Sequence, residues 1–170
     1  NEFKKMQELQ ESASIDSLTK LFNRAKFNYV LENEINIAQS TSSALSIIFF
    51  DIDDFKLVND NYGHNAGDSV LIELASLITS SLRQGDFVAR WGGEEFIVTL
   101  QATNVERAKT IAEVLRDRVQ KHPFDTVGAV TISLGVTQYL HNESEESFIN
   151  RADTALYEAK EAGKNKVVSK

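Results

Sequence analysis

The stretch Ala44-Leu-Ser-Ile-Ile-Phe-Phe-Asp51 decides the fold of this chain. Its apolar residues follow one another without the polar alternation of a half-exposed strand, and this pattern predicts a central strand buried on both faces. The run ends in acids, because Asp51 is its last residue and Asp53 follows two positions later. Side chains alternate between faces along a strand, so both acids should point to the same side.

A carboxylate at the end of a buried strand is costly to desolvate unless a cation or hydrogen bonds compensate. We therefore favour a functional role for Asp51. For Asp53, a structural role as a helix-capping acid explains the sequence equally well.

A hairpin is expected to lie beside this strand. The sequence RWGGEEFIVTL, Arg90–Leu100, places Gly92 and Gly93 between two strand-like runs. Both glycines tolerate positive φ, which makes the pair a strong hairpin signal. Glu94 and Glu95 then leave the turn on opposite faces, and one of them is expected to face the edge of the central strand.

Two neighbouring acids at a glycine turn suggest a site for a metal and a phosphate. Carboxylates from two adjacent strands, completed by water and phosphate oxygens, suit Mg²⁺. No histidine or cysteine is placed to favour zinc instead. Glycines also allow a ligand to approach the backbone closely. Taken alone, the hairpin is also explained as a tight turn with two solvated acids.

The remaining pattern predicts a mixture of helices and strands. Apolar residues at helical spacing predict helices over 17–39, 54–62, 67–82, 105–120 and 145–162, with N-caps at Asp16, Asn104 and Ser144. Strands are expected over 44–51, 87–91, 95–100, 129–138 and 165–168, and GHNAG (63–67) is expected to be a loop. This order predicts an α/β domain of the α+β type, in which helices flank a central mixed sheet.

Composition limits the partners and the compartment. The 170 residues, 42% hydrophobic and 25% charged, correspond to one globular domain. A formal net charge of -7 argues against a nucleic-acid polymer as partner. The absence of cysteine excludes disulfides and thiolate metal sites and fits a reducing compartment. Without a spanning apolar run or a signal peptide, we expect a cytoplasmic domain, whose parent protein could still be anchored in a membrane.

The first 14 residues form a separate segment. They are polar and helical in pattern, with a thin apolar stripe at Phe3, Met6, Leu9 and Ala13. Such a segment is either an end helix packed on the domain or the end of a coiled-coil linker from an upstream module, and we favour the linker. Because the first residue is Asn1 rather than Met, we expect a piece of a longer protein, with the domain proper over 15–170.

Several stretches together resemble the diguanylate cyclase family, which is named for its GGDEF signature. The block DIDDFKLVNDNYGHNAGDSVL from Asp51 precedes RWGGEEF, and GGEEF is a common form of the signature. DSLTKLFNRAKF from Asp16, TISLGVT from Thr131 and ADTALYEAKEAGKNKV from Ala152 resemble further family motifs in the right order. The resemblance covers about Asp16–Lys170 and implies a nucleotidyl-cyclase, palm-like fold with a mainly antiparallel sheet.

The activity implied by this resemblance is the condensation of two GTP into cyclic di-GMP and two pyrophosphates. The same resemblance implies a metal site made by Asp51, the carbonyl of Ile52, Glu94 and Glu95. Mg²⁺ is the expected ion, with Mn²⁺ as a substitute. Glu94, with Glu95 beside it, is the expected catalytic group, which helps to deprotonate the attacking 3′-hydroxyl.

Roles in binding GTP follow from the resemblance residue by residue. Asn59 and Asp68 would read guanine, which offers N–H donors to a carboxylate and an acceptor to an amide. His64 lies between them and either approaches the nucleotide or orders the loop. Gly92 and Gly93 would let the nucleotide lie against the turn.

Phosphate contacts are implied at two places. The backbone N–H groups of Asp54 and Phe55 open a helix and could receive phosphate, while Lys56, Lys160 and Lys164 would be cationic partners. Lys164 departs from the family, which usually has arginine there, and the loss of the bidentate fork predicts weaker substrate binding. Lys20 also departs, since glycine is usual at that position, and should alter a turn rather than the chemistry.

A product site is implied by Arg83-Gln-Gly-Asp86, which matches the family's RxxD pattern at its spacing before the glycine pair. Arginine can grip phosphate or a guanine edge and stack on a base, which suits such a ligand. The resemblance implies that cyclic di-GMP binds here and inhibits the enzyme. Arg90 is expected either to bridge towards this site or to brace the hairpin, and Arg107 or Arg116 to complete the site. The alternative is an exposed ion pair of little energetic weight.

The implied mechanism needs two domains, because one domain would hold one GTP and the product contains two GMP units. A homodimer with facing sites is therefore expected, and a sensor module upstream in the parent protein would set its geometry through residues 1–14. The alternatives are a catalytically silent module that senses GTP or cyclic di-GMP, a cyclase for another cyclic dinucleotide, and a structural dimerisation domain. The intact signature favours the diguanylate cyclase.

Overall fold

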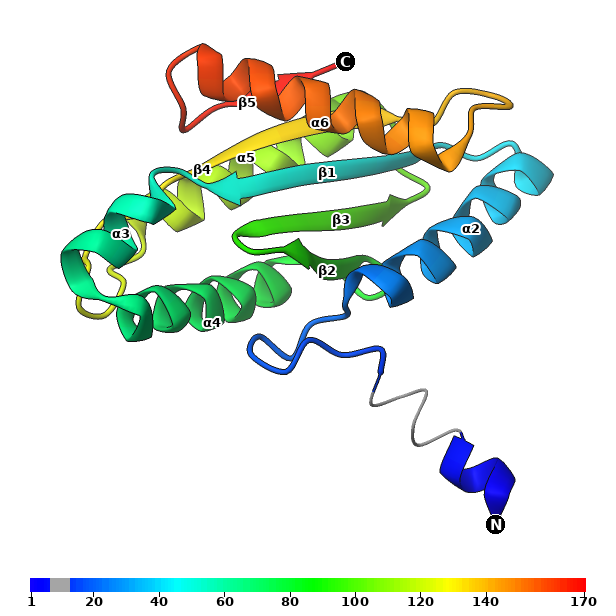
Figure 1. Ribbon diagram of the computed structural model, residues 1–170. Coiled ribbons are helices and arrows are strands. Elements are labelled where there is room, and N and C mark those ends of the chain that lie inside the picture. Colours follow the sequence, from blue (N-terminus) through cyan, green and yellow to red (C-terminus); the bar gives the residue numbers. More distant parts are fainter. Residues whose placement is uncertain (7–12) are drawn as a thin grey trace.

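Strand β1, Leu45–Ile52, lies at the centre of the sheet in the computed structural model, which describes residues 1–6 and 13–170. Every residue of β1 is buried, as the unbroken apolar run predicts. In Figure 1 the strand runs through the middle of the molecule, with α3 beyond one end and α2 beyond the other.

The sheet is mixed and mainly antiparallel, which confirms the predicted fold class. Its order is β2-β3-β1-β4-β5. All neighbouring strands run antiparallel except β4 and β5, which are parallel. The further strands are β2 (Phe87–Gly92), β3 (Glu95–Gln101), β4 (Ile132–Gln138) and β5 (Val167–Ser169).

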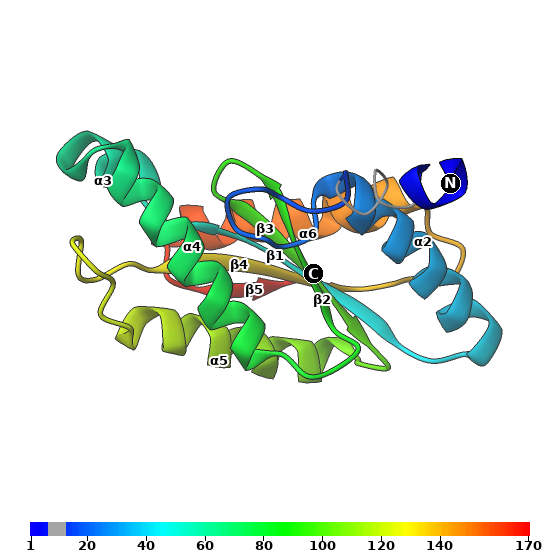
Figure 2. The same cartoon turned by 90° about the horizontal axis from the view of Figure 1, so that it is seen from below.

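Helices cover both faces of the sheet, which explains the burial of β1. Ile48 and Phe50 share one apolar cluster with α4 and α5, and Ile47 and Phe49 share the other with α2 and α6. Figure 2 shows the sheet between these two helix pairs. The helices are α2 (Arg24–Thr41), α4 (His64–Ser81), α5 (Val105–Lys121) and α6 (Glu145–Glu161).

Helix α6 approaches β4 unusually closely at Gly135. A Cβ atom at this position would lie 2.2 Å from the carbonyl oxygen of Ala152 and 2.4 Å from the backbone nitrogen of Leu156. Only glycine permits this approach. The contact fixes the position of α6, and thereby of Lys160 at its C-terminal end.

Helices α3 (Phe55–Tyr62) and α4 form a helical hairpin beyond the end of β1 (Figure 1). The prediction that GHNAG is a loop was wrong, because His64 is the first residue of α4. Gly63 is the single residue between α3 and α4, and the chain turns there with a φ of 90°, which glycine adopts without strain.

The start of α2 was also mispredicted. The helix begins at Arg24 with Asn23 as its N-cap, rather than at position 17 with Asp16 as its cap. Asp16 does accept a hydrogen bond from the backbone of Thr19, at 2.9 Å, but this bond closes a turn rather than a helix. The chain then reverses at Lys20, whose φ is 64°.

The N-terminal turn, residues 15–23, lies against the outer strand of the sheet. Phe22 forms a parallel bridge with Ala89 of β2, and its carbonyl accepts the N–H of Arg90 at 2.9 Å. Before this turn, residues 2–6 are helical and 13–14 form a turn. The predicted helix over 1–14 therefore does not extend to 13–14, and its part over 7–12 lies outside the described residues and stays a prediction.

Two strands are shorter or shifted relative to the prediction. β4 begins at Ile132 rather than 129, and β5 covers Val167–Ser169 rather than 165–168. Asn165 has a φ of 49° and donates its N–H to Asp53, so it belongs to the turn before β5. Among residues 1–6 and 13–170, no helix combines the length and apolar character that a membrane span requires.

Candidate active site

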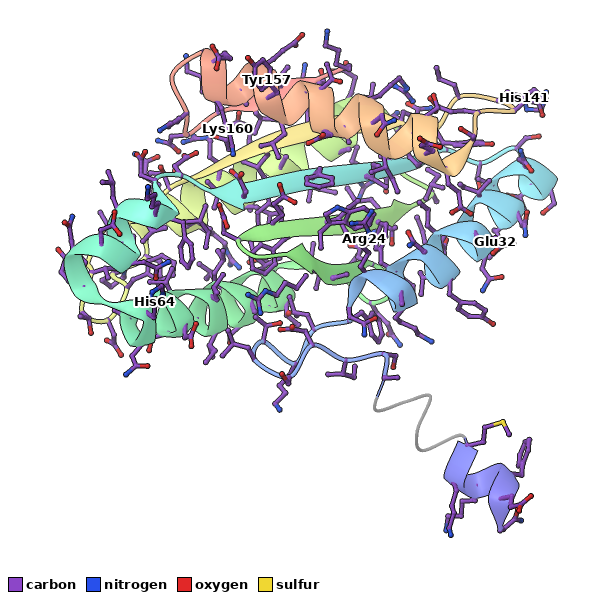
Figure 3. The ribbon with its side chains drawn as sticks, viewed as in Figure 1. Arg24, Glu32, His64, His141, Tyr157 and Lys160 are labelled. Atoms are coloured by element: carbon purple, nitrogen blue, oxygen red, sulfur yellow. The ribbon has the colours of Figure 1, made fainter. Side chains whose placement is uncertain are left out.

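The sheet register brings the two acidic motifs together at one end of the molecule. Asp51 of β1 lies directly opposite Glu95 of β3. The N–H of Ile52 donates to the carbonyl of Glu94 at 3.3 Å, so the end of β1 is bonded to the hairpin turn. Figure 3 shows Lys160 between α6 and the end of β1.

Asp51 is a buried carboxylate that lacks a full set of partners. It is only 2% exposed; its Oδ2 atom accepts a hydrogen bond from Nζ of Lys160, and its Oδ1 atom has no partner. The pKa of Asp51 is raised to about 6: burial raises it most, the bond and charge of Lys160 lower it, and the charges of Asp53 and Glu94 raise it. The site is therefore short of positive charge, as expected for a cation site.

Glu95 stands in the same acidic surroundings. Burial raises its pKa, and the charges of Asp153 and Glu94 raise it further. Sequence reasoning did not single out Asp153. Its spacing of seven residues from Lys160 on α6, which places both on one helix face, was the signal that could have found it.

The donor set fits a magnesium ion that shares its shell with a nucleotide. Within the described part of the chain, no group of three or more acidic or histidine side chains is arranged to hold a metal by itself. Mg²⁺ typically uses one or two carboxylates and takes its other ligands from phosphates and water. Asp51, with its unpartnered Oδ1, and the nearby Glu94 meet that requirement.

Asp53 has a structural place instead. It accepts the hydroxyl of Ser133 at 2.6 Å, the hydroxyl of Thr131 at 2.8 Å and the N–H of Asn165 at 2.9 Å. These bonds join the end of β1 to β4 and to the turn before β5. The helix-capping alternative does not hold, because Asp54 is the N-cap residue of α3.

The expected phosphate partners lie around this end of the sheet. Asp54 adopts a φ of 55° and accepts a hydrogen bond from Nζ of Lys164 at 2.5 Å. That bond raises the pKa of Lys164. Phe55 opens α3, and Lys56 is exposed on its first turn.

The expected guanine readers are brought together by the α3–α4 hairpin. A Cβ atom on Gly67 would lie 1.9 Å from Oδ1 of Asn59, so the amide of Asn59 lies directly over the glycine. Asp68 follows Gly67 on α4, and both Asp68 and His64 are exposed. Figure 3 places His64 at the junction of α3 and α4.

The RxxD residues are paired with each other. Nε of Arg83 lies 3.1 Å from Oδ1 of Asp86, and the side chain of Asp86 is only 2% exposed. Arg83 also donates to the hydroxyl of Thr103 at 2.5 Å and to the carbonyl of Gln101. In this arrangement Arg83 holds its own loop to the end of β3.

Arg90 braces the hairpin. Its Nε donates to the carbonyl of Gly93 at 2.9 Å, and its Nη1 lies 3.2 Å from a carboxylate oxygen of Asp16. The guanidinium thus joins the N-terminal turn to the glycine turn. Sequence reasoning had left this bracing role open beside a role in product binding.

Arg24 is a further residue that sequence reasoning missed. Its guanidinium lies 4.1 Å from the centre of the Trp91 ring, a cation–π distance. Both residues line a cavity of about 490 Å³ between α2, β2 and α6. No sequence spacing joins Arg24 to Trp91, because the register of α2 on the sheet creates the contact.

A buried acid short of cations, a glycine turn beside it and lysines at a helix end together have the chemistry of a site for a metal-bound polyphosphate. The family model described as "Diguanylate cyclase, GGDEF domain" matches residues 13–166. The chain therefore belongs to the diguanylate cyclase GGDEF-domain family, as its motifs predict.

Curated relatives carry the same family name. The chain is 41% identical over 165 residues to diguanylate cyclase DgcP of Pseudomonas aeruginosa, which covers 95% of this chain and 25% of that protein. It is 39% identical over 167 residues to diguanylate cyclase DgcM of Escherichia coli, which covers 96% of this chain and 40% of that protein. The chain thus spans less than half the length of these relatives.

Solved structures of the family have the same fold. The coiled coil and GGDEF domain of DgcB from Caulobacter crescentus, in complex with c-di-GMP, matches with a TM-score of 0.92 and 30% identity, covering 98% of this chain and 91% of that one. The active GGEEF domain of a diguanylate cyclase from Vibrio cholerae matches with a TM-score of 0.82 and 38% identity, covering 86% and 96%.

Proposed function

We propose that this domain is a diguanylate cyclase, which condenses two GTP into cyclic di-GMP and releases two pyrophosphates. The observation that carries the proposal is the buried Asp51 carboxylate, with one oxygen unpartnered, opposite the GGEEF hairpin. Family membership and the names of the relatives support it. Nothing in a structural dimerisation role would require an acid at that buried position.

Asp51, Glu94 and the carbonyl of Ile52 would hold Mg²⁺ or Mn²⁺, with Glu95 beside them. The bound cation would neutralise charge on the triphosphate and on the leaving pyrophosphate. Lys160 and Lys164 would face the same phosphates from α6 and the turn that follows it.

Glu94 accepts the proton of the 3′-hydroxyl of one GTP as that oxygen attacks the α-phosphorus of the other. The bond from this phosphorus to pyrophosphate breaks. The same step in the opposite direction closes the ring and releases the second pyrophosphate. Catalysis then rests mainly on positioning and electrostatics.

Base selection is assigned to the α3–α4 hairpin. Asp68 accepts hydrogen bonds from the N1–H and N2–H of guanine, and the side-chain amide of Asn59 donates to an acceptor on the guanine edge. Adenine lacks the N1–H donor, so Asp68 favours GTP over ATP. Because Gly67 has no Cβ atom, the Asn59 amide has room to lie over it.

Two domains must meet for the ring to close. Each domain holds one GTP, so the active form is a homodimer with facing sites. An upstream sensor module in the parent protein would control that geometry through residues 1–14. The connection of the N-terminal turn to the glycine hairpin, from Asp16 through Arg90 to Gly93, supports this route.

Product inhibition is assigned to Arg83 and Asp86. Cyclic di-GMP would have to open their ion pair and the bonds of Arg83 to Gln101 and Thr103. Arg107 is the better third arginine, because it lies in the first turn of α5 and Arg83 is bonded to Thr103 just before that helix. Arg116 lies two and a half turns away and is bonded to Asn165.

The test is a product assay with the domain fused at its N-terminus to a dimeric coiled coil. Incubation with GTP and Mg²⁺ is expected to give cyclic di-GMP by mass spectrometry. Glu94→Gln is the control, because it keeps the size of the side chain and loses the base and the charge. It should bind GTP and give no product.

Two results would contradict the proposal. Equal product from Glu94→Gln would remove the signature acid from catalysis. A verified dimer that binds nucleotide without turnover would favour the silent sensor, with Arg83 and Asp86 as its functional centre.

A further inference from the structure

Lys160 occupies the place beside Asp51 where a divalent cation is expected to bind. We propose that Lys160 acts as a stand-in cation, which pairs with Asp51 in the metal-free domain and moves to substrate phosphate when the metal takes its place. The inference rests on the proposed function, because it assumes that Asp51 is a metal ligand. It goes further by giving Lys160 two roles: it pairs with Asp51 when no metal is bound, and it binds substrate phosphate when the metal is bound.

Lys160 contacts the buried carboxylate of Asp51 directly. The ammonium group of Lys160 bonds to Oδ2 of Asp51, whose side chain is 3% exposed. Burial of a carboxylate without a counter-charge is costly, so the Lys160 ammonium group stabilises the buried Asp51 carboxylate when no metal is bound. Oδ1 remains without a partner, which leaves room on the carboxylate for a cation of higher charge.

The side chain of Lys160 is partly exposed, although the helix that carries it is held in place. The backbone of α6 is fixed by its close contact with Gly135, and the neighbouring Ala159 is fully buried. The side chain of Lys160 is nevertheless 36% exposed. Its flexible stem can therefore swing the ammonium group from the carboxylate to a phosphate without moving the helix.

Lys164 offers an internal comparison. It pairs with Asp54, but both side chains are largely in solvent, with 45% and 52% exposure. An exposed pair of this kind has little energetic weight. Both lysines are implied phosphate partners, yet only Lys160 shields a buried metal ligand.

The arrangement predicts competition in the absence of nucleotide. A metal ion must displace Lys160 from Asp51, and with no phosphate present the lysine gains no new partner. Removing the amino group should therefore tighten metal binding to the free domain. With GTP present the same change should weaken nucleotide binding, because a phosphate partner is lost.

The experiment measures Mn²⁺ binding without nucleotide, by the electron paramagnetic resonance signal of free Mn²⁺, for wild type, Lys160→Met and Lys164→Met. Lys160→Met is expected to bind Mn²⁺ roughly tenfold more tightly than wild type, since a charge in direct contact with the ligand is removed. Lys164→Met, the matched control, should stay within about twofold. Asp51→Asn should abolish the tight site.

Unchanged or weaker Mn²⁺ binding by Lys160→Met would overturn the proposal. Equal tightening by Lys160→Met and Lys164→Met would also overturn it, because general electrostatics would then be the cause. If Lys160→Met is not folded by circular dichroism, Lys160→Gln replaces it, since glutamine can still donate to Asp51 without a charge.

The product assay separates this inference from the proposed function. Tighter Mn²⁺ binding by Lys160→Met, together with a wild-type dimer that makes no cyclic di-GMP, supports the stand-in role and contradicts the cyclase. Cyclic di-GMP synthesis by wild type without any tightening in Lys160→Met supports the cyclase and contradicts the stand-in role.

Discussion

The ionised form of Asp51 lowers the stability of the folded domain. Burial raises its pKa to about 6, above the ordinary value of 3.8. Because the folded chain holds the proton more tightly than the unfolded chain, ionisation of Asp51 favours unfolding. The contribution of this group to stability is fully present below the ordinary pKa and is lost as the pH rises through about 6.

Asp51→Asn should remove this pH dependence. In metal-free buffer, the free energy of unfolding of the variant relative to wild type should rise by up to about 3 kcal/mol between about pH 4 and pH 7. Urea unfolding of both proteins across this range is the measurement. A constant difference at every pH would show that Asp51 titrates normally in the folded chain.

Lys20 is a second residue whose backbone conformation affects the stability of the domain. Its φ of 64° is costly for a residue with a Cβ atom, and its N–H is bonded to the carbonyl of Asp16 at 2.8 Å. This explains in physical terms why a glycine suits the position.

Lys20→Gly should stabilise the domain by up to about 1 kcal/mol, because relief of strain exceeds the added entropy of the unfolded chain. Lys20→Ala keeps the strain and is the control, which should show no gain. Chemical denaturation decides between them, and equal stability of all three proteins would contradict the account.

At the scale of elements, Arg90 joins parts that are distant in sequence. It connects the N-terminal turn, through Asp16, with the carbonyl of Gly93 in the hairpin. The N-terminal turn therefore contacts the signature hairpin directly. Movement of the segment that precedes α2 would reach the hairpin of Glu94 and Glu95 through the Arg90 side chain and through the bridge between Phe22 and Ala89.

Arg90→Met should lower stability by about 1–3 kcal/mol, since charged hydrogen bonds are lost at a partly buried place. If the hairpin also loses its geometry, kcat should fall more than nucleotide affinity. Lys121→Met breaks an exposed pair on α5 and is the control. Unfolding curves and steady-state kinetics test both parts, and an Arg90→Met protein with unchanged kcat would exclude a positioning role.

Gly135→Ala tests the packing of α6 on β4. The added Cβ would clash with the backbone at Ala152 and Leu156, so the helix must shift, at a cost of about 1–3 kcal/mol or more. Gly92→Ala, where nothing lies within 4 Å, is the control for stability. Thermal unfolding measures the difference, and similar losses in both variants would contradict close packing as the cause.

The elements were predictable wherever a long hydrophobic pattern specified them, as in β1, α5 and α6. Their ends were less predictable, because Asp16 forms the same bond to a turn that it would form to a helix. The residues of the candidate site that belong to sequence motifs were predictable. The pairing of Lys160 with Asp51 and the contact of Arg24 with Trp91 depend on register and packing, which a single sequence does not contain. The ion pair of Arg83 with Asp86 and the bracing role of Arg90 were among the alternatives that the sequence left open, and both contacts are present in the structure.

At the scale of the whole molecule, the acids, the lysines and the α3–α4 hairpin gather at one end of the sheet, while the Arg83 loop is bonded to the opposite end of β3 (Figure 1). If the cyclase needs two facing domains, the active ends must meet and the loop of Arg83 stays outside that contact. Substrate turnover and product binding would then use separate surfaces.

A mixed dimer tests the two-domain mechanism. When wild type is paired with Glu94→Gln through a heterodimeric coiled coil, only one condensation keeps its base. The expected result is loss of most cyclic product with accumulation of a linear dinucleotide, seen by mass spectrometry. Half of the wild-type yield of cyclic di-GMP would instead mean that one intact domain closes the ring alone.

The bridge between Phe22 and Ala89 has a consequence for solubility. Strand β2 is an outer strand of the sheet, and an uncovered outer strand is a template for pairing with other chains and for aggregation. The N-terminal turn occupies part of that edge. Trimming the domain back to the start of α2 would expose it, so the boundary chosen for expression should decide whether the protein remains dispersed or precipitates.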